Sequence, residues 1–309
     1  MKSNLLLTLL LLFSYTFLFA QTVSPDTKVV YKQVGDVALE LHIFTPEKQA
    51  SSKAAVVLIH GGGWNQGSPS AFYRQAKHLS ERGLVVFCPQ YRLRKINGTT
   101  IVEAVEDAQS AVAYVRNHAK EYNIKPNKIA VGGGSAGGHL AASTAFLPSL
   151  NKDITEEDYA PNLLLLFNPV IDTSKEGYAH RLVDKEVKAA GFDSWENFSP
   201  RQNINKNFPP TLIEVGNHDK VLPEKVARDY QKICQEKGLE CQLDIYKGAE
   251  HSFFNIGYGK KQGYEKGTIN KWYFEVLQQA DNFLVKHKYL KNNVEIDIPS
   301  EAIYPIRKQ

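Results

Sequence analysis

The chain has few cysteines and no strong excess of charge of either sign. Its 309 residues include three cysteines, with no Cys-x-x-Cys pair and no His/Cys spacing suited to a metal ion. Lysine plus arginine number 37 and aspartate plus glutamate 33, so the formal net charge is +4, with both signs well mixed. No aromatic-basic pattern is present, which argues against nucleic acid as a partner. We expect neither a metal nor a cofactor.

Long apolar runs are also missing, except at the start of the chain. A basic residue at Lys2 precedes an almost wholly apolar stretch at residues 5–19, and Ala20 then stands before Gln21. This pattern predicts a secretory signal peptide at residues 1–20, and therefore a secreted or periplasmic protein. An uncleaved membrane anchor is the alternative, although the run is short for a spanning helix. Residues 21–309 suit one domain, and nothing in them indicates an oligomeric state.

The three cysteines receive separate predictions. Cys234 and Cys241 stand at the end of one predicted helix and the start of the next strand. They could form a disulfide in an oxidising compartment, and the sequence leaves this open. Cys88 lies in an apolar run and is predicted to be a small core residue.

Predicted strands and helices alternate along the mature chain. Residues 29–34 and 37–44 alternate apolar and polar side chains around Gly35-Asp36, which predicts an antiparallel hairpin. Further strands are predicted at residues 54–59, 84–88, 128–131, 163–167, 211–216 and 240–246, and helices at residues 70–82, 101–120, 140–146, 223–236 and 272–287. This order predicts an α/β fold with a mostly parallel central sheet, right-handed crossovers and helices on both faces.

Ser135 lies between a predicted strand and a predicted helix, in the run GGGSAGG at residues 132–138. Side chains at Gly133 and Gly137 would collide with the flanking strand and helix, so the turn can be very tight. The spacing predicts a nucleophile elbow, with the Ser135 hydroxyl exposed at the helix N-terminus. The same letters fit the dinucleotide motif G-x-G-x-x-G, but strands precede this loop and no acidic residue closes the next strand.

Three consecutive glycines follow the predicted strand at residues 54–59, in the sequence HGGGW. Glycines there can present bare backbone N–H groups to a negatively charged oxygen. We expect an oxyanion hole formed by Gly62, Gly63 and the N–H of Ala136. A flexible loop is the alternative. His60 is expected to brace this loop through hydrogen bonds.

These motifs resemble a known family. HGGGW at residues 60–64, YRL at 91–93 and GGSAGGHL at 133–140 are similar to the esterase branch of the α/β-hydrolase family. That branch includes hormone-sensitive-lipase-like enzymes and bacterial acetyl-xylan or feruloyl esterases. The resemblance covers roughly residues 37–289 and implies an α/β-hydrolase fold, with Trp64 and Tyr91 as substrate-binding residues. It departs at residues 94–98, and the cluster of Arg92, Arg94 and Lys95 is most simply a solvated loop.

The remaining catalytic candidates follow two later strands. Residues 216–223 resemble the family's G-x-x-D-x-x-x-P turn, which puts Asp219 in the acid position, and His251 follows the last predicted strand. Ser135, Asp219 and His251 then stand in the chain order of this fold. His251 would accept the Ser135 proton, and Asp219 would hold the imidazole in the correct tautomer. Rival bases are His218 and His139, and rival acids are Glu250 and Glu214.

The polar segment at residues 173–207 lies where the family inserts a lid. Its aromatic side chains either line the acyl or leaving-group pocket or pack the segment onto the sheet; they are Tyr178, Phe192, Trp195 and Phe198. Secretion, a modest polar lid and the resemblance together predict a serine esterase that removes small acyl groups, acetyl or feruloyl, from carbohydrate.

Three other functions share parts of this pattern. A prolyl-oligopeptidase-type peptidase or amidase uses the same catalytic residues but usually carries a propeller domain, for which the chain has no room. A lipase would be expected to show a larger apolar lid. A non-catalytic α/β-hydrolase-like binding protein would typically have lost one of the three catalytic residues. The tail at residues 291–309 has no predicted function.

Overall fold

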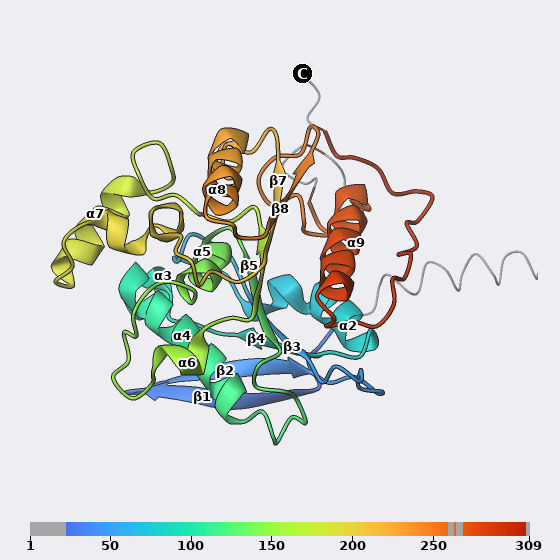
Figure 1. Ribbon diagram of the computed structural model, residues 1–309, viewed down its shortest axis with the longest axis horizontal. Coiled ribbons are helices and arrows are strands. Elements are labelled where there is room, and N and C mark those ends of the chain that lie inside the picture. The colour runs from blue at the N-terminus through green and yellow to red at the C-terminus, as the bar shows by residue number, and fades with distance from the viewer. Residues whose placement is uncertain (1–22, 259–262, 264–267, 307–309) are drawn as a thin grey trace, which may run out of the picture.

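The computed structural model describes residues 23–258, 263 and 268–306, so the predicted signal peptide at residues 1–20 lies outside the described residues. Eight strands of the described part form one sheet in the order β1-β2-β4-β3-β5-β6-β7-β8 (Figure 1). β1 (Thr27–Val34), β2 (Val37–Phe44) and β4 (Val85–Pro89) pair antiparallel. The other neighbours pair parallel, and they add β3 (Ala55–Ile59), β5 (Ile129–Gly134), β6 (Leu163–Phe167), β7 (Thr211–Gly216) and β8 (Cys241–Tyr246). The predicted fold class is confirmed.

Helices cover both faces of this sheet (Figure 1). Val57 and Ile59 of β3 pack into one apolar cluster, whereas Val56 and Leu58 pack into another, because successive side chains of a strand point to opposite faces. The first cluster includes α4 (Ile101–Asn117), α5 (Ala136–Ser143) and α8 (Glu224–Glu236); the second includes α2 (Tyr73–Glu81) and α9 (Lys271–Lys286). No helix of the described residues is both long and apolar enough to cross a membrane.

Most predicted elements differ from the observed ones only near their ends. The predicted helix at residues 70–82 is split into η1 (Pro69–Phe72) and α2, and the one at residues 101–120 ends at Asn117. α4 begins in a capping box between Thr100 and Glu103, which fixes its first turn. Two short helices had no counterpart in the sequence prediction: α3 (Arg94–Asn97) and α6 (Glu156–Tyr159).

The segment at residues 173–207 forms a small helical cover. It contains α7 (His180–Ala189), η2 (Trp195–Phe198) and η3 (Pro200–Asn203). Val183 and Val187 of α7 are buried in the cluster shared with α4. At the N-terminus of α4, the Glu186 carboxylate accepts the Ile101 backbone N–H at 2.9 Å and pairs with Arg94 at 2.6 Å. The cover is therefore bonded to the body of the fold through α4.

The loop after β4 is not solvated as the sequence predicted. Arg92 is buried, and its guanidinium donates to both carboxylate oxygens of Asp107 at 2.8 Å. Asp107 is fully buried on α4 and also accepts the Arg92 backbone N–H at 2.9 Å and the Lys32 ammonium at 2.7 Å. A buried carboxylate needs such partners, and the apolar pattern of α4 does not reveal where they come from. Of the predicted cluster, Lys95 is exposed.

All three cysteines are buried free thiols. Cys88 is completely buried in the core, as predicted, and burial raises the pKa of its thiol. Cys234 of α8 and Cys241 of β8 are both buried, with no disulfide between them.

Replacing Asp107 by alanine should strongly destabilise the fold. Arg92 and Lys32 would then share the half-buried Glu106, with which both already pair. Removing one partner from a buried ion pair typically costs about 3–5 kcal/mol, and we expect the free energy of unfolding of Asp107→Ala to fall by about that much. Urea denaturation measures this quantity.

The matched control is Glu236→Ala, from the exposed pair that Glu236 makes with Lys232 at 3.8 Å. Its loss should stay below about 1 kcal/mol, as for exposed ion pairs in general. Equal losses in the two variants would contradict the buried network as a source of stability.

Candidate active site

Ser135 occupies the sharp turn between β5 and α5. Its backbone has φ 55° and ψ −121°, which is strained for a residue with a side chain. A Cβ atom on Gly137 would lie 2.0 Å from the carbonyl oxygen of Ile59, and one on Gly133 would lie 2.4 Å from that of Gly137. The turn therefore forms only with glycine at both flanking positions. The Ser135 N–H donates to the Phe167 carbonyl at 3.0 Å, which ties the turn to β6.

Ser135, His251 and Asp219 are joined by hydrogen bonds. His251 Nε2 lies 2.8 Å from Ser135 Oγ, and His251 Nδ1 lies 2.8 Å from Asp219 Oδ2. Because an ionised carboxylate only accepts, Nδ1 donates to Asp219, and Nε2 is left to accept the serine O–H. The other carboxylate oxygen accepts the N–H groups of Val221 and Leu222 at 2.7 and 2.9 Å. The three side chains come from the ends of β5, β7 and β8.

Neither rival base, His139 or His218, lines the pocket that contains Ser135 and His251. His139 is completely buried, its Nε2 lies 2.7 Å from the Phe198 carbonyl, and burial lowers its pKa to about 4. His218 is exposed on the rim. His60 stacks on Tyr91 with ring centroids 4.4 Å apart, and burial lowers its pKa to about 4. Its Nδ1 donates to the Gly61 carbonyl at 2.8 Å, so His60 braces the glycine loop.

The glycine loop borders a pocket of about 310 Å³ that also contains Ser135 and His251. Gly62 and Gly63 line it, and Ala136 follows Ser135 directly as the first residue of α5. Gly62 has φ 125°, and a Cβ there would lie 1.8 Å from the Gln66 carbonyl oxygen. The Gly62 carbonyl accepts the N–H groups of Asn65 and Gln66 at 3.2 Å each. These bonds fold the loop back on itself, against the alternative of a flexible connection.

Trp64 and Tyr91 lie elsewhere than their predicted role as substrate-binding residues requires. They are 1% and 3% exposed, and neither lines the pocket. The Tyr91 hydroxyl donates to the His60 carbonyl at 3.0 Å. The Trp64 ring packs against His139 and Tyr178, with centroids 5.2 and 6.0 Å away. Both side chains pack on the side of the glycine loop that faces away from the pocket. A sequence motif does not encode the direction in which its side chains point.

Of the aromatic residues in the cover, Tyr178 lines the pocket. Its hydroxyl lies 3.6 Å from where a Cβ on Gly63 would stand, and its N–H donates to the Asp172 carbonyl at 2.9 Å. The others pack within the cover: Phe192 on Phe198 at 5.0 Å and Trp195 on His180 at 5.3 Å between ring centroids. The sequence showed this aromatic group but not which member faces the pocket.

The apolar wall of the pocket comes from phenylalanines on separate elements. Phe72 of η1 and Phe254 of the His251 loop stack with centroids 5.5 Å apart. Phe254 also stacks on Phe167 at 5.6 Å. The site thus combines a hydroxyl, an imidazole, a glycine loop and a small apolar surface, a set suited to acyl transfer.

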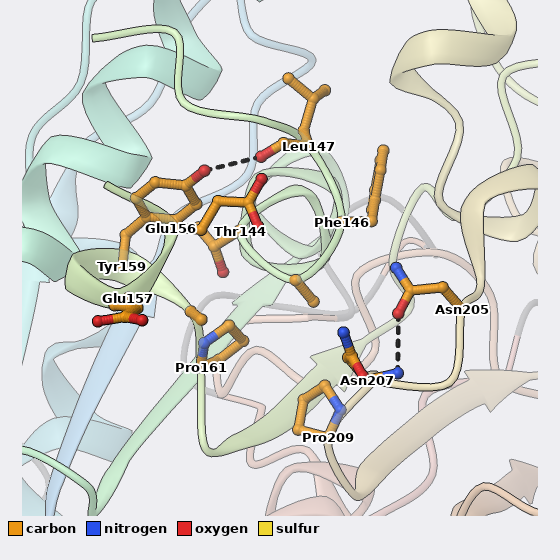
Figure 2. Close-up of a pocket in the computed structure, with 12 residues that line it drawn as sticks. Thr144, Phe146, Leu147, Glu156, Glu157, Tyr159, Pro161, Asn205, Asn207 and Pro209 are labelled. Atoms are coloured by element: carbon orange, nitrogen blue, oxygen red, sulfur yellow. Dashed lines mark hydrogen bonds between the residues drawn. The ribbon is translucent and has the colours of Figure 1, made fainter. Parts of the chain in front are cut away.

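Another pocket, of about 240 Å³, lies beyond the C-terminal end of α5, next to the residues that lead into β6 and β7 (Figure 2). Tyr159 donates its hydroxyl to the Leu147 carbonyl at 3.0 Å, and the Asn207 N–H donates to Asn205 Oδ1 at 2.8 Å. Its lining, drawn wholly from described residues, contains no serine, histidine or cysteine. It therefore offers no nucleophile and base of the kind found beside Ser135.

Neither rival acid takes the place of Asp219 on His251 Nδ1. Glu250 is half-buried next to His251 in the chain. Glu214 is completely buried in β7, where its carboxyl accepts the Tyr246 hydroxyl at 2.6 Å. Burial raises the pKa of Glu214 well above its ordinary value, so its neutral form is favoured in the folded protein.

Glu214→Gln should stabilise the protein increasingly as pH rises. Unfolded glutamate titrates near pH 4.3, so between that value and the raised folded pKa the folded wild type binds more protons than the unfolded chain. The free energy of unfolding of the wild type therefore falls with rising pH. Glutamine keeps the acceptor for Tyr246 but cannot ionise, so its advantage should grow by up to about 1.4 kcal/mol per pH unit.

Urea denaturation of both proteins from about pH 4 to about pH 8 measures this difference, which should be smallest near the ordinary glutamate pKa. A difference that stays constant over the whole range would contradict a buried neutral carboxyl at this position.

The chain is similar to known esterases in sequence and structure. Residues 41–233 match the model of the BD-FAE family. A solved esterase of the Planctomycetes species Thermogutta terrifontis, Est2 with propionate bound, is 32% identical, with 89% of this chain and 99% of that chain covered and a TM-score of 0.77. The same esterase phosphorylated by paraoxon is 33% identical, with 88% and 97% covered and a TM-score of 0.75.

Two curated relatives are also similar. The acetylxylan esterase of Xylanibacter ruminicola is 29% identical over 92% of this chain and 55% of its own length. The probable carboxylic ester hydrolase LipM of Mycobacterium tuberculosis is 29% identical over 69% of this chain and 52% of its own length. The chain thus spans about half the length of these curated relatives.

Proposed function

Because this chain belongs to the BD-FAE family of α/β-hydrolase esterases, we propose that it is a secreted serine carboxylesterase that acts on small acyl esters of carbohydrates. The observation that carries the proposal is the pair of 2.8 Å contacts that join Ser135, His251 and Asp219 in series. The likeness of the whole fold to a solved esterase supports the same reaction class.

The reaction begins with attack of Ser135 Oγ on the ester carbonyl carbon. His251 Nε2 takes the serine proton as the new C–O bond forms, and Asp219 stabilises the imidazolium through Nδ1. The carbonyl oxygen becomes negative and would accept N–H groups from Gly62, Gly63 and Ala136. Preorganised donors of this kind lower the barrier because they need not reorient as charge develops.

Collapse of this intermediate breaks the bond to the alcohol oxygen, which takes the proton from His251 Nε2 and leaves as the alcohol. The acyl group remains on Ser135 Oγ. Water then attacks the acyl carbon while His251 takes one of its protons, and collapse of the second intermediate returns that proton to Ser135. The acid leaves, and the free enzyme is restored.

The substrate class rests on the pocket and on one relative. The stacked Phe72 and Phe254 offer an apolar surface for a short acyl group, in a pocket of about 310 Å³. The Tyr178 hydroxyl reaches the same space from the cover and can hydrogen-bond a polar alcohol component. A curated relative is named an acetylxylan esterase, which supports acetylated carbohydrate over a simple alcohol. A peptidase or amidase with the same catalytic residues, or a non-catalytic binding protein, is the alternative.

Ser135→Ala should abolish the hydrolysis of 4-nitrophenyl acetate, with kcat lower by about 10⁴-fold or more, because the nucleophile is removed. Ser300→Ala, an exposed serine outside the pocket, serves as control and should keep the activity of the wild type. Retained activity of Ser135→Ala would place the nucleophile elsewhere.

The same two variants and the wild type are then compared on acetylated xylan, methyl ferulate and a 4-nitroanilide. Acetate release from xylan that depends on Ser135 is the expected result. Faster cleavage of the anilide would favour the amidase alternative, and hydrolysis confined to 4-nitrophenyl acetate would contradict the carbohydrate substrate.

Secretion is proposed from residues 1–20 alone. The exported protein should begin at Gln21, because a signal peptidase would cut after Ala20. Mass spectrometry of the protein recovered outside the cytoplasm measures its N-terminus. Protein that keeps residues 1–20 and stays with the membrane fraction would instead support the uncleaved anchor.

A further inference from the structure

Asparagine side chains hold the loop that carries His251 at several points. The Ser252 N–H donates to Asn168 Oδ1 at 2.8 Å, and the Gly248 N–H donates to Asn217 Oδ1 at 2.7 Å. On the far side of His251, Asn270 Nδ2 donates to the carbonyls of Phe253 and Asn255 at 2.5 and 2.9 Å. His251 lies on a loop rather than on a strand, so its position depends on these bonds.

Asn270 uses both ends of its amide. Its Oδ1 accepts the Trp272 backbone N–H at 3.1 Å and so caps the N-terminus of α9. Its Nδ2 has two hydrogens, and each can serve one of the two loop carbonyls. The side chain is fully buried, so water does not compete for these bonds. One residue thus couples the start of α9 to the loop after His251.

The segment at residues 291–306 holds Asn270 from the other side. Asn270 and Ile303 form a parallel bridge, in which Ile303 N–H donates to Ile269 at 3.0 Å and its carbonyl accepts the Lys271 N–H at 2.8 Å. The Tyr304 ring packs on Trp272 with centroids 5.3 Å apart. In Figure 1 this segment runs from the end of α9 back to the loops beyond β7 and β8.

We propose that Asn270 is a positioning residue for His251, fixed in turn by the segment at residues 291–306. The inference rests on the proposed function, since it concerns the base of that reaction. Ser252, next to His251, has φ 73°, a left-handed conformation that the surrounding bonds must maintain. If the donors of Asn270 are lost, the loop relaxes and His251 Nε2 drifts from its place beside Ser135 Oγ.

The variant Asn270→Asp separates the two uses of the side chain. Aspartate is as good a helix cap as asparagine, so the bond to Trp272 N–H is kept. The oxygen that replaces Nδ2 cannot donate a hydrogen bond, so it faces the carbonyl oxygens of Phe253 and Asn255 without a bond to either. We expect kcat on 4-nitrophenyl acetate to fall by about 10²-fold, the cost of a displacement of about 1 Å at a reacting group. KM should change by less than about threefold, because the Phe254 ring is also held by its stacking on Phe72 and Phe167, which does not involve Asn270.

Two further variants complete the design. In Asn270→Ser the serine side chain can also cap the helix but is too short to reach both carbonyls. Because it brings no buried charge, this variant replaces Asn270→Asp in the test if Asn270→Asp does not fold. Asn127→Asp makes the same chemical change at an exposed position before β5, outside the C-terminal segment, and should behave as the wild type. Thermal unfolding verifies that the variants compared are folded.

Hydrogen exchange of the peptide that contains His251 gives a readout that does not need turnover. It should exchange faster in Asn270→Ser and Asn270→Asp than in Asn127→Asp, and the rate of Ser135 phosphorylation by paraoxon should fall together with kcat. A folded Asn270→Ser with wild-type kcat and wild-type exchange of this peptide would overturn the inference. A wild type that neither hydrolyses esters nor reacts with paraoxon would overturn the proposed function instead, and the exchange rates would still show whether Asn270 holds the loop.

Discussion

Close backbone packing around Ser135 is the constraint from which the rest of the site follows. A Cβ atom at position 137 would lie 2.0 Å from the Ile59 carbonyl oxygen, so the chain can turn from β5 into α5 only without a side chain there. That turn lifts the Ser135 hydroxyl to the edge of the sheet where β7 and β8 also end. Asp219 and His251 can then meet it from short loops, as parallel strands bring their carboxyl ends to one edge.

Support for the site continues into the core. The buried pair of Arg92 and Asp107 fixes the chain just after Tyr91, and Tyr91 holds His60 by a ring stack and by a hydrogen bond to its carbonyl. His60 in turn bonds the Gly61 carbonyl at the start of the glycine loop. Residues without any contact to the pocket thus decide where Gly62 and Gly63 lie. The motif YRL has its physical explanation in this series of contacts.

Much of this fold could be predicted from the sequence, since buried strands leave apolar runs and tight turns leave glycines. Ser135 can be predicted in the same way, from the glycines that flank it after a strand. Asp219 and His251 also follow strands, but the resemblance to the family is what assigns them the acid and base positions. The direction in which the Trp64 and Tyr91 side chains point could not be predicted. A bulky residue beside a glycine loop can point into the pocket or away from it. The burial of Arg92 could not be predicted, because its partner Asp107 lies fifteen residues away on another element. The position of Tyr178 in the pocket wall depends on how the cover folds, and local sequence patterns do not specify that.

The cover at residues 173–207 is tied to α4 by Glu186, which receives both the Ile101 N–H and the Arg94 guanidinium. Asp172, immediately before the cover, pairs with Arg201 inside it at 3.1 Å. These bonds would have to break before the cover could move away from the body of the fold. The cover thus holds Tyr178 in the wall of the pocket, and the size of that pocket is a property of the folded chain.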